Sequence, residues 1–286
     1  MTSKMTFIGF GEAAMAFATP GARGYDLKLD DPATRTAKLA DFAAHGAQAC
    51  NDAAEALAGA RVIFSLVTAD QAYPAARDNA AQLEPAALWL DMNSVAPDTK
   101  RAAAMAIEPH ADYVDVAVMA PVHPARLNVP LLVSGPHAER GAGALAQAGF
   151  GNIRIVDGGV GAASAIKMIR SVMIKGTEAL SAECALAAEA AGVRQEVIAS
   201  LDAGWPADWE RRLDYNLDRM MVHGLRRAAE MEEVVKTLDG LGVGTSMTRG
   251  TIERQRAIGA LRAHPPEGLL AKLAVLLPLT RQEKAA

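Results

Sequence analysis

The chain has 286 residues, enough for one large or two medium domains that bury a core without disulfides or structural metals. It is 51% hydrophobic and 22% charged with a net charge of −4, which excludes a disordered protein and argues against a general nucleic-acid binder. Cys50 and Cys184 are far apart, so we expect no disulfide, no metal site and reduced thiols in a cytoplasm. Lys272 and Pro278 interrupt the most apolar run, residues 269–279, so we expect no membrane span.

Short apolar runs alternate with alanine-rich segments through the first half of the chain. Strands that alternate with helices indicate crossover connections and a largely parallel sheet. The helices between the strands include residues 33–45 and 99–107. The predicted strands are residues 5–9, 25–29, 61–67, 87–91, 113–118, 131–134 and 153–156.

The pattern changes at the glycines of residues 158–161, after which we predict no strand. The chain therefore divides into an α/β domain, residues 1–159, and an all-helical domain, residues 160–286. Predicted helices of the second domain are residues 162–191, 196–203, 209–238 and 251–261, with turns at 205–206 and 240–244.

A glycine turn directly follows the first predicted strand, where Gly9, Gly11 and Ala14 match the pattern G-x-G-x-x-A. Glycines allow a tight turn and let the backbone approach a pyrophosphate, while a small third residue lets helix and strand pack closely. A plain glycine turn after a strand would look the same, so the motif alone is weak.

Asp30 and Asp31 end the next predicted strand, about 20 residues after the turn, where a carboxylate holds a ribose hydroxyl in dinucleotide-binding domains. The alternative is a solvated loop before Pro32, and Arg35 could instead accept a 2′-phosphate. We favour NAD over NADP as the cofactor.

Several further motifs follow in a familiar order: residues 91–97, Gly161 with Lys167 six residues later, and the runs 167–180 and 223–231. On these motifs the chain resembles the β-hydroxyacid dehydrogenase family, which includes 3-hydroxyisobutyrate and 6-phosphogluconate dehydrogenases. The last two runs resemble a narrower group with a distinctive C-terminal domain. The resemblance, which covers nearly the whole chain, implies an α/β Rossmann domain followed by an all-α domain, with homodimers that share their active-site surroundings.

The resemblance also implies residue roles, with Lys167 as the catalytic acid or base. Together with the turn and its spacing, it implies cofactor-binding roles for Gly9, Phe10, Gly11, Glu12, Ala13, Ala14, Asp30, Asp31, Leu66, Val67, Asn93 and Ser94. From the family loop, the lysine motif and the chemistry of the neighbouring residues, the candidate substrate-binding residues are Met119, Ala120, Pro121, His123, Ser171, Lys175, His223 and Arg226.

Two departures from the family pattern concern the substrate. The family loop that cradles a carboxylate contains a serine and two glycines, which residues 115–121 of this chain lack. The family asparagine four residues after the lysine is Ser171 here. Both departures count against a simple 3-hydroxy acid as the substrate. Neither changes the prediction of cofactor binding or of a catalytic Lys167.

Lys167, Ser171 and Lys175 lie at i, i+4 and i+8, so they share one face of the predicted long helix. Alcohol oxidation needs a base for the hydroxyl proton and the reverse reaction needs an acid, and a lysine can serve both. The alternative is a solvated helix surface, and for Lys175 the structural and functional readings stay equally open.

The second marker run carries basic residues with two interpretations. Arg226 can pair with Glu230 one helical turn away, which we slightly favour, or bind an anionic substrate or cofactor phosphate together with Arg227. His223 is a candidate for the substrate side, although a lone histidine is more often a structural residue, which we favour. His123 lies in a loop near the expected substrate side and could equally be structural.

We therefore expect a cytoplasmic, homodimeric NAD(P)-dependent oxidoreductase that acts on a small hydroxylated or carbonyl substrate. An imine reductase is an alternative within the enzymes, and a non-catalytic dinucleotide-binding regulator is an alternative from another class. The presence of Lys167 favours alcohol chemistry over imine reduction, and it argues against a non-catalytic regulator.

Overall fold

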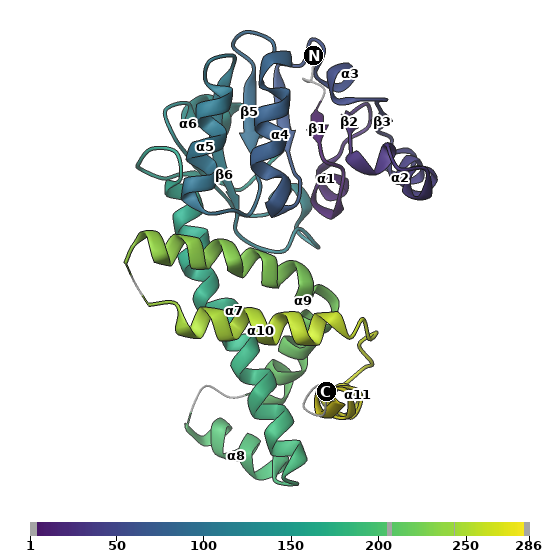
Figure 1. Cartoon of the computed structure of the whole chain (residues 1–286), viewed down its shortest axis with the longest axis vertical. Coiled ribbons are helices and arrows are strands. Elements are labelled where there is room, and N and C mark those ends of the chain that lie inside the picture. The colour runs from purple at the N-terminus through teal and green to yellow at the C-terminus, as the bar shows by residue number, and fades with distance from the viewer. Residues whose placement is uncertain (1–4, 205–207, 243, 283–286) are drawn as a thin grey trace. The chain divides into compact units, whose positions relative to one another are not determined.

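The computed structural model describes residues 5–204, 208–242 and 244–282. They form two compact units, Met1–Met168 and Ile169–Ala286, which are drawn in Figure 1 and described separately here. The long helix α7 (Ala162–Ala190) begins in the first unit and continues into the second. The predicted domain boundary, after residue 159, lies just before this helix.

The first unit is built on one eight-stranded sheet with the strand order β3-β2-β1-β4-β5-β6-β7-β8. All neighbours pair in parallel except β6 and β7, which are antiparallel, so the expectation of a largely parallel sheet is confirmed. Its strands are β1 (Thr6–Ile8), β2 (Arg23–Tyr25), β3 (Gln48–Ala49), β4 (Val62–Ser65), β5 (Leu88–Asp91), β6 (Asp112–Val118), β7 (Leu131–Ser134) and β8 (Ile153–Ile155).

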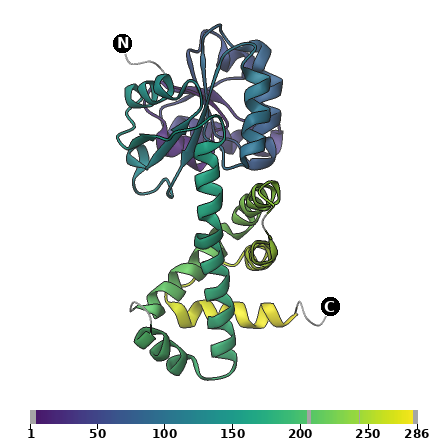
Figure 2. The same ribbon diagram turned by 90° about the vertical axis from the view of Figure 1, so that its left-hand side faces the viewer.

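Helices cover both faces of this sheet, as the edge-on view in Figure 2 shows. Alternate residues of each strand enter opposite cores, since successive side chains of a strand point to opposite faces. On β1, Phe7 joins the core that contains Phe10 and Phe42, whereas Ile8 joins the core that contains Trp89. The helices are α1 (Glu12–Phe17), α2 (Pro32–Ala44), α3 (Ala53–Leu57), α4 (Ala72–Asn79), α5 (Pro97–Ile107) and α6 (Ala138–Gln147).

The prediction of a strand at residues 25–29 is wrong. The second strand is β2, which ends at Tyr25, and Leu27–Leu29 form a turn of 3-10 helix. Asp26 causes this ending because its carboxylate accepts a hydrogen bond from the Lys28 backbone N–H and caps the turn. Leu27 is consequently 59% exposed instead of filling a strand position in the core.

The second unit contains the rest of α7 and four further helices, and its described residues contain no strand, as expected. The further helices are α8 (Arg194–Gly204), α9 (Trp209–Gly240), α10 (Ser246–Ala260) and α11 (Leu269–Gln282). Figure 1 shows α9 and α10 side by side, and leucines and methionines of α9 lie in the core of this unit. The turn predicted at 205–206 lies outside the described residues, as does part of the turn at 240–244.

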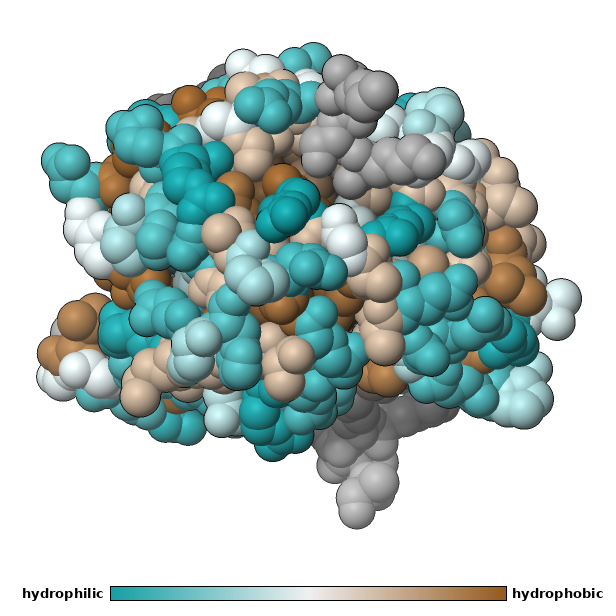
Figure 3. All heavy atoms as spheres, turned by 90° about the horizontal axis from the view of Figure 1, so that it is seen from above, coloured by the Kyte–Doolittle hydropathy of each residue, from teal (hydrophilic) through white to brown (hydrophobic). Residues whose placement is uncertain are grey.

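None of the described helices combines the length and hydropathy needed to cross a bilayer. The face in Figure 3 is dominated by hydrophilic residues, with hydrophobic ones in several separate places. The apolar run at residues 269–279 belongs to α11, where Leu269, Leu273 and Leu276 are buried in the core of the second unit. One side of this run therefore packs into the protein core.

Candidate cofactor and catalytic site

The glycine turn lies between β1 and α1. Gly9 has a left-handed backbone with φ +86°, and a Cβ atom there would lie 2.4 Å from the carbonyl oxygen of Leu66. Its N–H donates to the carbonyl oxygen of Tyr25 at 2.8 Å. Only glycine fits this position, because both the backbone conformation and the close approach of the β4 end exclude a side chain.

Gly11 has the opposite environment. A Cβ atom at this position would meet no described atom within 4 Å, and its φ of −91° suits any residue. The protein itself therefore does not require a glycine at Gly11. An open space beside a dinucleotide turn fits a pyrophosphate that approaches the backbone there, so the residues present fit the predicted cofactor.

Neighbouring residues hold the turn in place. Phe10 is buried with its ring stacked on Phe42 at 3.8 Å between centroids, and its carbonyl oxygen accepts a hydrogen bond from Lys38 Nζ at 2.8 Å. Ala14 is fully buried, as close packing of α1 on the sheet requires. Glu12 is exposed and Ala13 is half-buried, at the start of the helix.

Three aspartates follow β2, and the structure gives each a different partner. Asp26, directly after the strand, accepts the Phe10 backbone N–H at 2.7 Å, so it touches the glycine turn. Asp30 accepts from the Tyr25 hydroxyl, and Asp31 caps α2 by accepting the Ala33 N–H at 2.9 Å. Among the three, Asp26 is thus the carboxylate that contacts the turn, and the sequence interpretation did not single it out because the strand was expected to continue past it.

The ends of β4 and β5 are joined by Asn93. Its side-chain oxygen accepts the Val67 N–H at 2.7 Å, and its amide donates to Ser65 Oγ at 3.0 Å. Asn93 is only 3% exposed, whereas Leu66 and Val67 are half-buried. This pairing holds the loops after two adjacent parallel strands together, at the edge where open α/β sheets bind their ligands.

Lys167 lies near the start of α7 and meets the loop after β5. Its Nζ donates a hydrogen bond to the hydroxyl of Ser94, and its side chain is partly buried. The first unit therefore brings together two predicted residues that are 73 positions apart in the chain. A donor amine against a hydroxyl, next to the carboxyl ends of the strands, is an arrangement suited to proton transfer.

A buried network of charges lies behind this pair. Lys100 Nζ is 2.9 Å from Asp91 Oδ1 and 3.4 Å from Asp115 Oδ1, and all three side chains are fully buried. Asp91 also accepts the backbone N–H of Asn93 at 3.0 Å. The ammonium thus compensates two carboxylates that could not stay charged in the interior on their own.

Asp115 binds the beginning of α7. It accepts the backbone N–H of Gly161 at 3.0 Å, the backbone N–H of Ser164 at 3.2 Å and the Ser164 hydroxyl at 2.7 Å. The first N–H groups of a helix have no partner within the helix, and a carboxylate there also interacts favourably with the helix dipole. Asp115 therefore fixes the helix start that carries Lys167.

Tyr113 completes the network from β6, where its hydroxyl donates to Asp91 Oδ2 at 2.7 Å. Burial, and then the charges of Asp91 and Asp115, raise the pKa of the Tyr113 phenol well above its ordinary value. The phenol is therefore a permanent hydrogen-bond donor, and the proton it holds keeps negative charge from accumulating around Lys100.

The segment after β6 contains four of the predicted substrate residues. Met119 is half-buried, and its N–H donates to the carbonyl oxygen of Pro130 at 2.8 Å. Ala120, Pro121 and His123 are exposed. The structure thus places Ala120, Pro121 and His123 on the surface of the first unit, with Met119 partly covered.

The other predicted substrate residues lie in the second unit around Glu230. Lys175 Nζ is 2.8 Å from Glu230 Oε2 and donates to Ser171 Oγ at 3.2 Å, with both Lys175 and Ser171 buried. Arg226 pairs with the other Glu230 oxygen at 2.9 Å, as its helical spacing predicted. His223 is half-buried on the same helix, α9.

The matches to known proteins agree with this arrangement. Residues 4–142 match the family described as the NAD binding domain of 6-phosphogluconate dehydrogenase, and residues 188–258 match a domain of unknown function, DUF1932. A conserved hypothetical protein from Sinorhizobium meliloti 1021 is 37% identical, covers 98% of this chain and 97% of its own, and has a TM-score of 0.72. The chain belongs to the 6-phosphogluconate dehydrogenase-like, or β-hydroxyacid dehydrogenase, family.

Other solved members and neighbours of this family share the fold. MTH1747, a conserved protein of unknown function described as structurally similar to 3-hydroxyacid dehydrogenases, is 27% identical, with 91% of this chain and 98% of that chain covered and a TM-score of 0.67. The 3-hydroxyisobutyrate dehydrogenase of Mycobacterium tuberculosis, solved with L-serine, is 19% identical, with 96% and 99% covered and a TM-score of 0.73. No curated protein matches the sequence.

As a member of this dehydrogenase family, the protein has an NAD(P)-binding Rossmann domain followed by a helical region, as expected. The backbone conformation of Gly9 and the open space at Gly11 are compatible with that cofactor. The sequence interpretation missed the buried lysine of the site. Lys100 occupies the apolar stripe of α5 with Ala103, Ala104 and Ile107, and a lysine in such a stripe is the signal that could have revealed it.

Proposed function

We propose that this protein is an NAD(P)-dependent oxidoreductase for a small hydroxy acid or a related alcohol or carbonyl compound, with Lys167 as the general acid and base. The observation that carries the proposal is the hydrogen bond from Lys167 to Ser94 at the ligand-binding edge of a dinucleotide-binding sheet. Neighbours named as 3-hydroxyisobutyrate dehydrogenases support the class of substrate.

Within this proposal, Lys167 and Ser94 share the proton of the reacting hydroxyl. The neutral amine of Lys167 accepts that proton as the carbon–oxygen bond becomes a carbonyl, and the ammonium returns it in the reverse direction. Ser94 accepts a hydrogen bond from the amine, so its own hydroxyl hydrogen is available to the substrate oxygen. The bound nicotinamide dinucleotide supplies the acceptor or donor of the hydride.

The cofactor side of the proposal uses the turn and the strand ends. The backbone of residues 9–14 approaches the pyrophosphate, with Gly11 leaving the space for it. Leu66 and Val67 line the cofactor at the end of β4, and Asn93 holds Val67 in place. Asp26 is the carboxylate for the adenosine ribose, with Asp30 and Asp31 further along the same segment.

Lys175, Ser171, His223 and Arg226 stay proposals for the substrate side, as do residues 119–121 and His123. The buried Lys175–Glu230 pair and the exposed Arg226 suit an anionic group on the substrate. We further propose a cytoplasmic homodimer as the working form of the enzyme.

The test is a hydride-transfer assay, with NAD and NADP against a panel of hydroxy acids, alcohols and cyclic imines. We expect Lys167→Met to lower kcat on the preferred alcohol about 10²–10⁴-fold, the usual effect of losing a positioned acid or base. Dinucleotide affinity, measured by calorimetry, should stay unchanged. Lys236→Met is the matched control, because Lys236 is an exposed lysine of α9 whose loss should leave kcat unchanged.

Three outcomes would overturn the proposal. A Lys167→Met protein that folds and keeps near-normal kcat would remove the lysine from the mechanism. A wild-type protein that binds the dinucleotide tightly but oxidises no member of the panel would favour the non-catalytic regulator, and turnover confined to imines would favour an imine reductase.

A further inference from the structure

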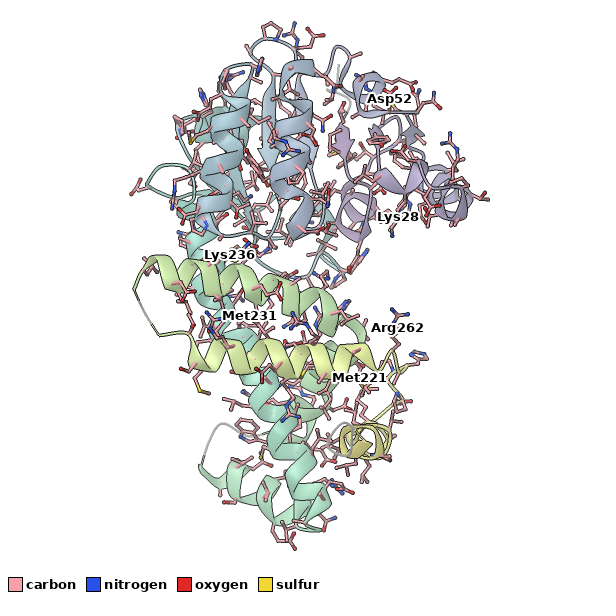
Figure 4. All side chains as sticks on the ribbon, viewed as in Figure 1. Lys28, Asp52, Met221, Met231, Lys236 and Arg262 are labelled. Atoms are coloured by element: carbon pink, nitrogen blue, oxygen red, sulfur yellow. The ribbon has the colours of Figure 1, made fainter. Side chains whose placement is uncertain are left out.

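A pocket of about 540 Å³ lies within the second unit. It is lined by residues 221–226 of α9, Gly259 of α10 and residues 262–265, which follow α10. Figure 4 labels Arg262, just beyond the end of α10, and Met221 on α9. The volume is typical of a site for a small organic molecule.

Two glycines of the lining, Gly224 and Gly259, contact each other. A Cβ atom at Gly224 would lie 2.8 Å from the Gly259 Cα, and one at Gly259 would lie 2.5 Å from the Leu225 backbone nitrogen. The backbones of α9 and α10 therefore touch where the pocket is, and neither position has room for a side chain. Larger residues beside the two glycines form the rest of the lining.

Arg262 supplies charge at one wall. It has a left-handed backbone with φ +49°, at a helix end where glycine or asparagine is usual. Its guanidinium is exposed and has no hydrogen bond or ion pair to any residue that the structure describes. His264, two residues on, is also exposed and lines the same pocket.

Arg226 supplies a second positive charge to the lining. It is half-exposed, and it pairs with Glu230, which the buried Lys175 also contacts. The lining contains no aspartate or glutamate. Anions are therefore favoured in the pocket over cations and neutral molecules.

The remaining wall is apolar. Val222 is 52% exposed and Leu225 is 45% exposed, although both belong to a helix that packs well elsewhere. Ala263 and Pro265 face the same space. A ligand that covers these side chains gains from removing apolar surface from water, in addition to its contact with the guanidinium groups.

We infer that this pocket binds a small amphiphilic anion, in which a carboxylate or phosphate meets Arg262 and Arg226 and a short hydrocarbon part covers Val222 and Leu225. The inference does not depend on hydride transfer, because it rests on the second unit alone. The ligand has two possible sources, the anionic end of the enzyme's own substrate or a separate effector acid. The chemistry that recognises it is the same in both cases.

Binding can be measured on the full-length protein by calorimetry or ligand-observed NMR. The probes are hexanoate and hexyl phosphate, with hexanol as the neutral analogue and acetate as the anion without a chain. We expect hexanoate or hexyl phosphate to bind at least about tenfold more tightly than hexanol and acetate. Arg262→Gln should weaken binding of the anionic probe about tenfold or more, because it removes the charge and keeps most of the side-chain length.

Arg256→Gln is the matched control for charge. Arg256 is an exposed arginine of α10 that pairs with Glu232, and neither residue belongs to the pocket lining, so its loss should not affect binding of the probe. Ala263→Phe is a second, independent variant, which should block the pocket by filling it. Thermal melting shows whether each variant is folded.

Three results would overturn the inference: no binding of either anionic probe at about 5 mM, equal affinity for hexanol, or equal weakening by the Arg256 and Arg262 variants. These binding experiments test the pocket even if the proposed oxidoreductase function is wrong, since none of them requires turnover. Where turnover is found, a probe that raises only KM for the substrate identifies the substrate site, and one that leaves KM unchanged identifies an effector site.

Discussion

The ammonium of Lys100 lies 3.4 Å from Asp115 Oδ1, and neither side chain reaches solvent. Through Asp115 this lysine is connected to the start of α7, and through Asp91 it is connected to the loop that contains Ser94. The proposed proton-transfer pair therefore has one buried cation behind both of its members. Removal of that cation leaves two carboxylates without compensation in the interior.

Lys100→Met should lower the free energy of unfolding by about 3–5 kcal/mol, the usual cost of breaking a buried ion pair on one side. Chemical denaturation measures this loss. Arg101→Met is the control, because the neighbouring Arg101 forms an exposed pair with Asp98 that contributes little. Equal losses in the two variants would show that the buried network does not hold this part of the fold.

The two glycines of the turn should respond differently to substitution. Gly11→Val should fold normally, because a side chain there meets no described atom, but should abolish dinucleotide binding by occupying the pyrophosphate path. Gly9→Ala should lower thermal stability, since its Cβ would collide with the Leu66 carbonyl. Calorimetry and melting curves on both variants measure these effects, and unchanged binding by Gly11→Val would contradict the assignment of the turn.

Cofactor choice should follow the carboxylates after β2. We expect the wild-type protein to prefer NAD, because a nearby carboxylate repels the 2′-phosphate of NADP. Asp26→Asn should reduce the ratio of NADP to NAD dissociation constants more than Asp30→Asn or Asp31→Asn, since Asp26 alone of the three touches the glycine turn. A wild-type preference for NADP by about tenfold, or about 1.4 kcal/mol, would contradict this prediction.

Alkaline pH should destabilise the protein through Tyr113. Its pKa is raised in the folded state, so the unfolded chain releases the phenolic proton first as the pH rises past about 10. The stability contributed by the neutral phenol is complete below that pH and is lost above it, with a slope of up to about 1.4 kcal/mol per pH unit. In Tyr113→Phe, the melting temperature should decrease less steeply between about pH 9.5 and 11 than in the wild-type protein. An unchanged slope would show that other groups cause the decrease.

The proposed homodimer can be tested on α7. Within the second unit, Ile169, Met173 and Leu180 leave an apolar stripe on this helix, with Met173 70% exposed. Met173→Glu should convert a dimer to a monomer in light scattering at micromolar concentration, because a charge in an apolar interface is costly. Met105→Glu, at a methionine of α5 that is 77% exposed, should leave the mass unchanged. A monomeric wild-type protein would contradict the proposal directly.

The elements with strong local patterns could be predicted from the sequence. The runs that became β4, β5 and β7 are apolar on both faces, and α7 is rich in alanine without an internal proline. The failure at residues 25–29 has a local cause that hydropathy does not register, since Asp26 ends the strand by capping a turn. The two-residue strand β3 was missed because its exposed Gln48 shows no apolar pattern.

The sequence predicted the parts of the candidate site that follow a local motif, and missed the parts that depend on contacts between distant segments. The glycine turn and Lys167 follow from spacing and resemblance, whereas the roles of Asp91, Lys100 and Asp115 depend on three elements that meet only in the folded sheet. Tyr113 appeared as an ordinary strand residue, and its hydroxyl acquires a function through burial beside Asp91. Long-range pairing of polar side chains has no periodicity that a sequence could display.

The contrast between Gly9 and Gly11 predicts how this turn should diverge among its relatives. Folding alone preserves Gly9, so any descendant with the same sheet must retain it. The fold does not require Gly11, so on the proposed assignment of the turn only a bound nucleotide preserves it, and a lineage that abandons the cofactor is free to replace it. The residue at the position of Gly11 in a related sequence should therefore distinguish relatives that still bind the cofactor from relatives that have retained only the fold.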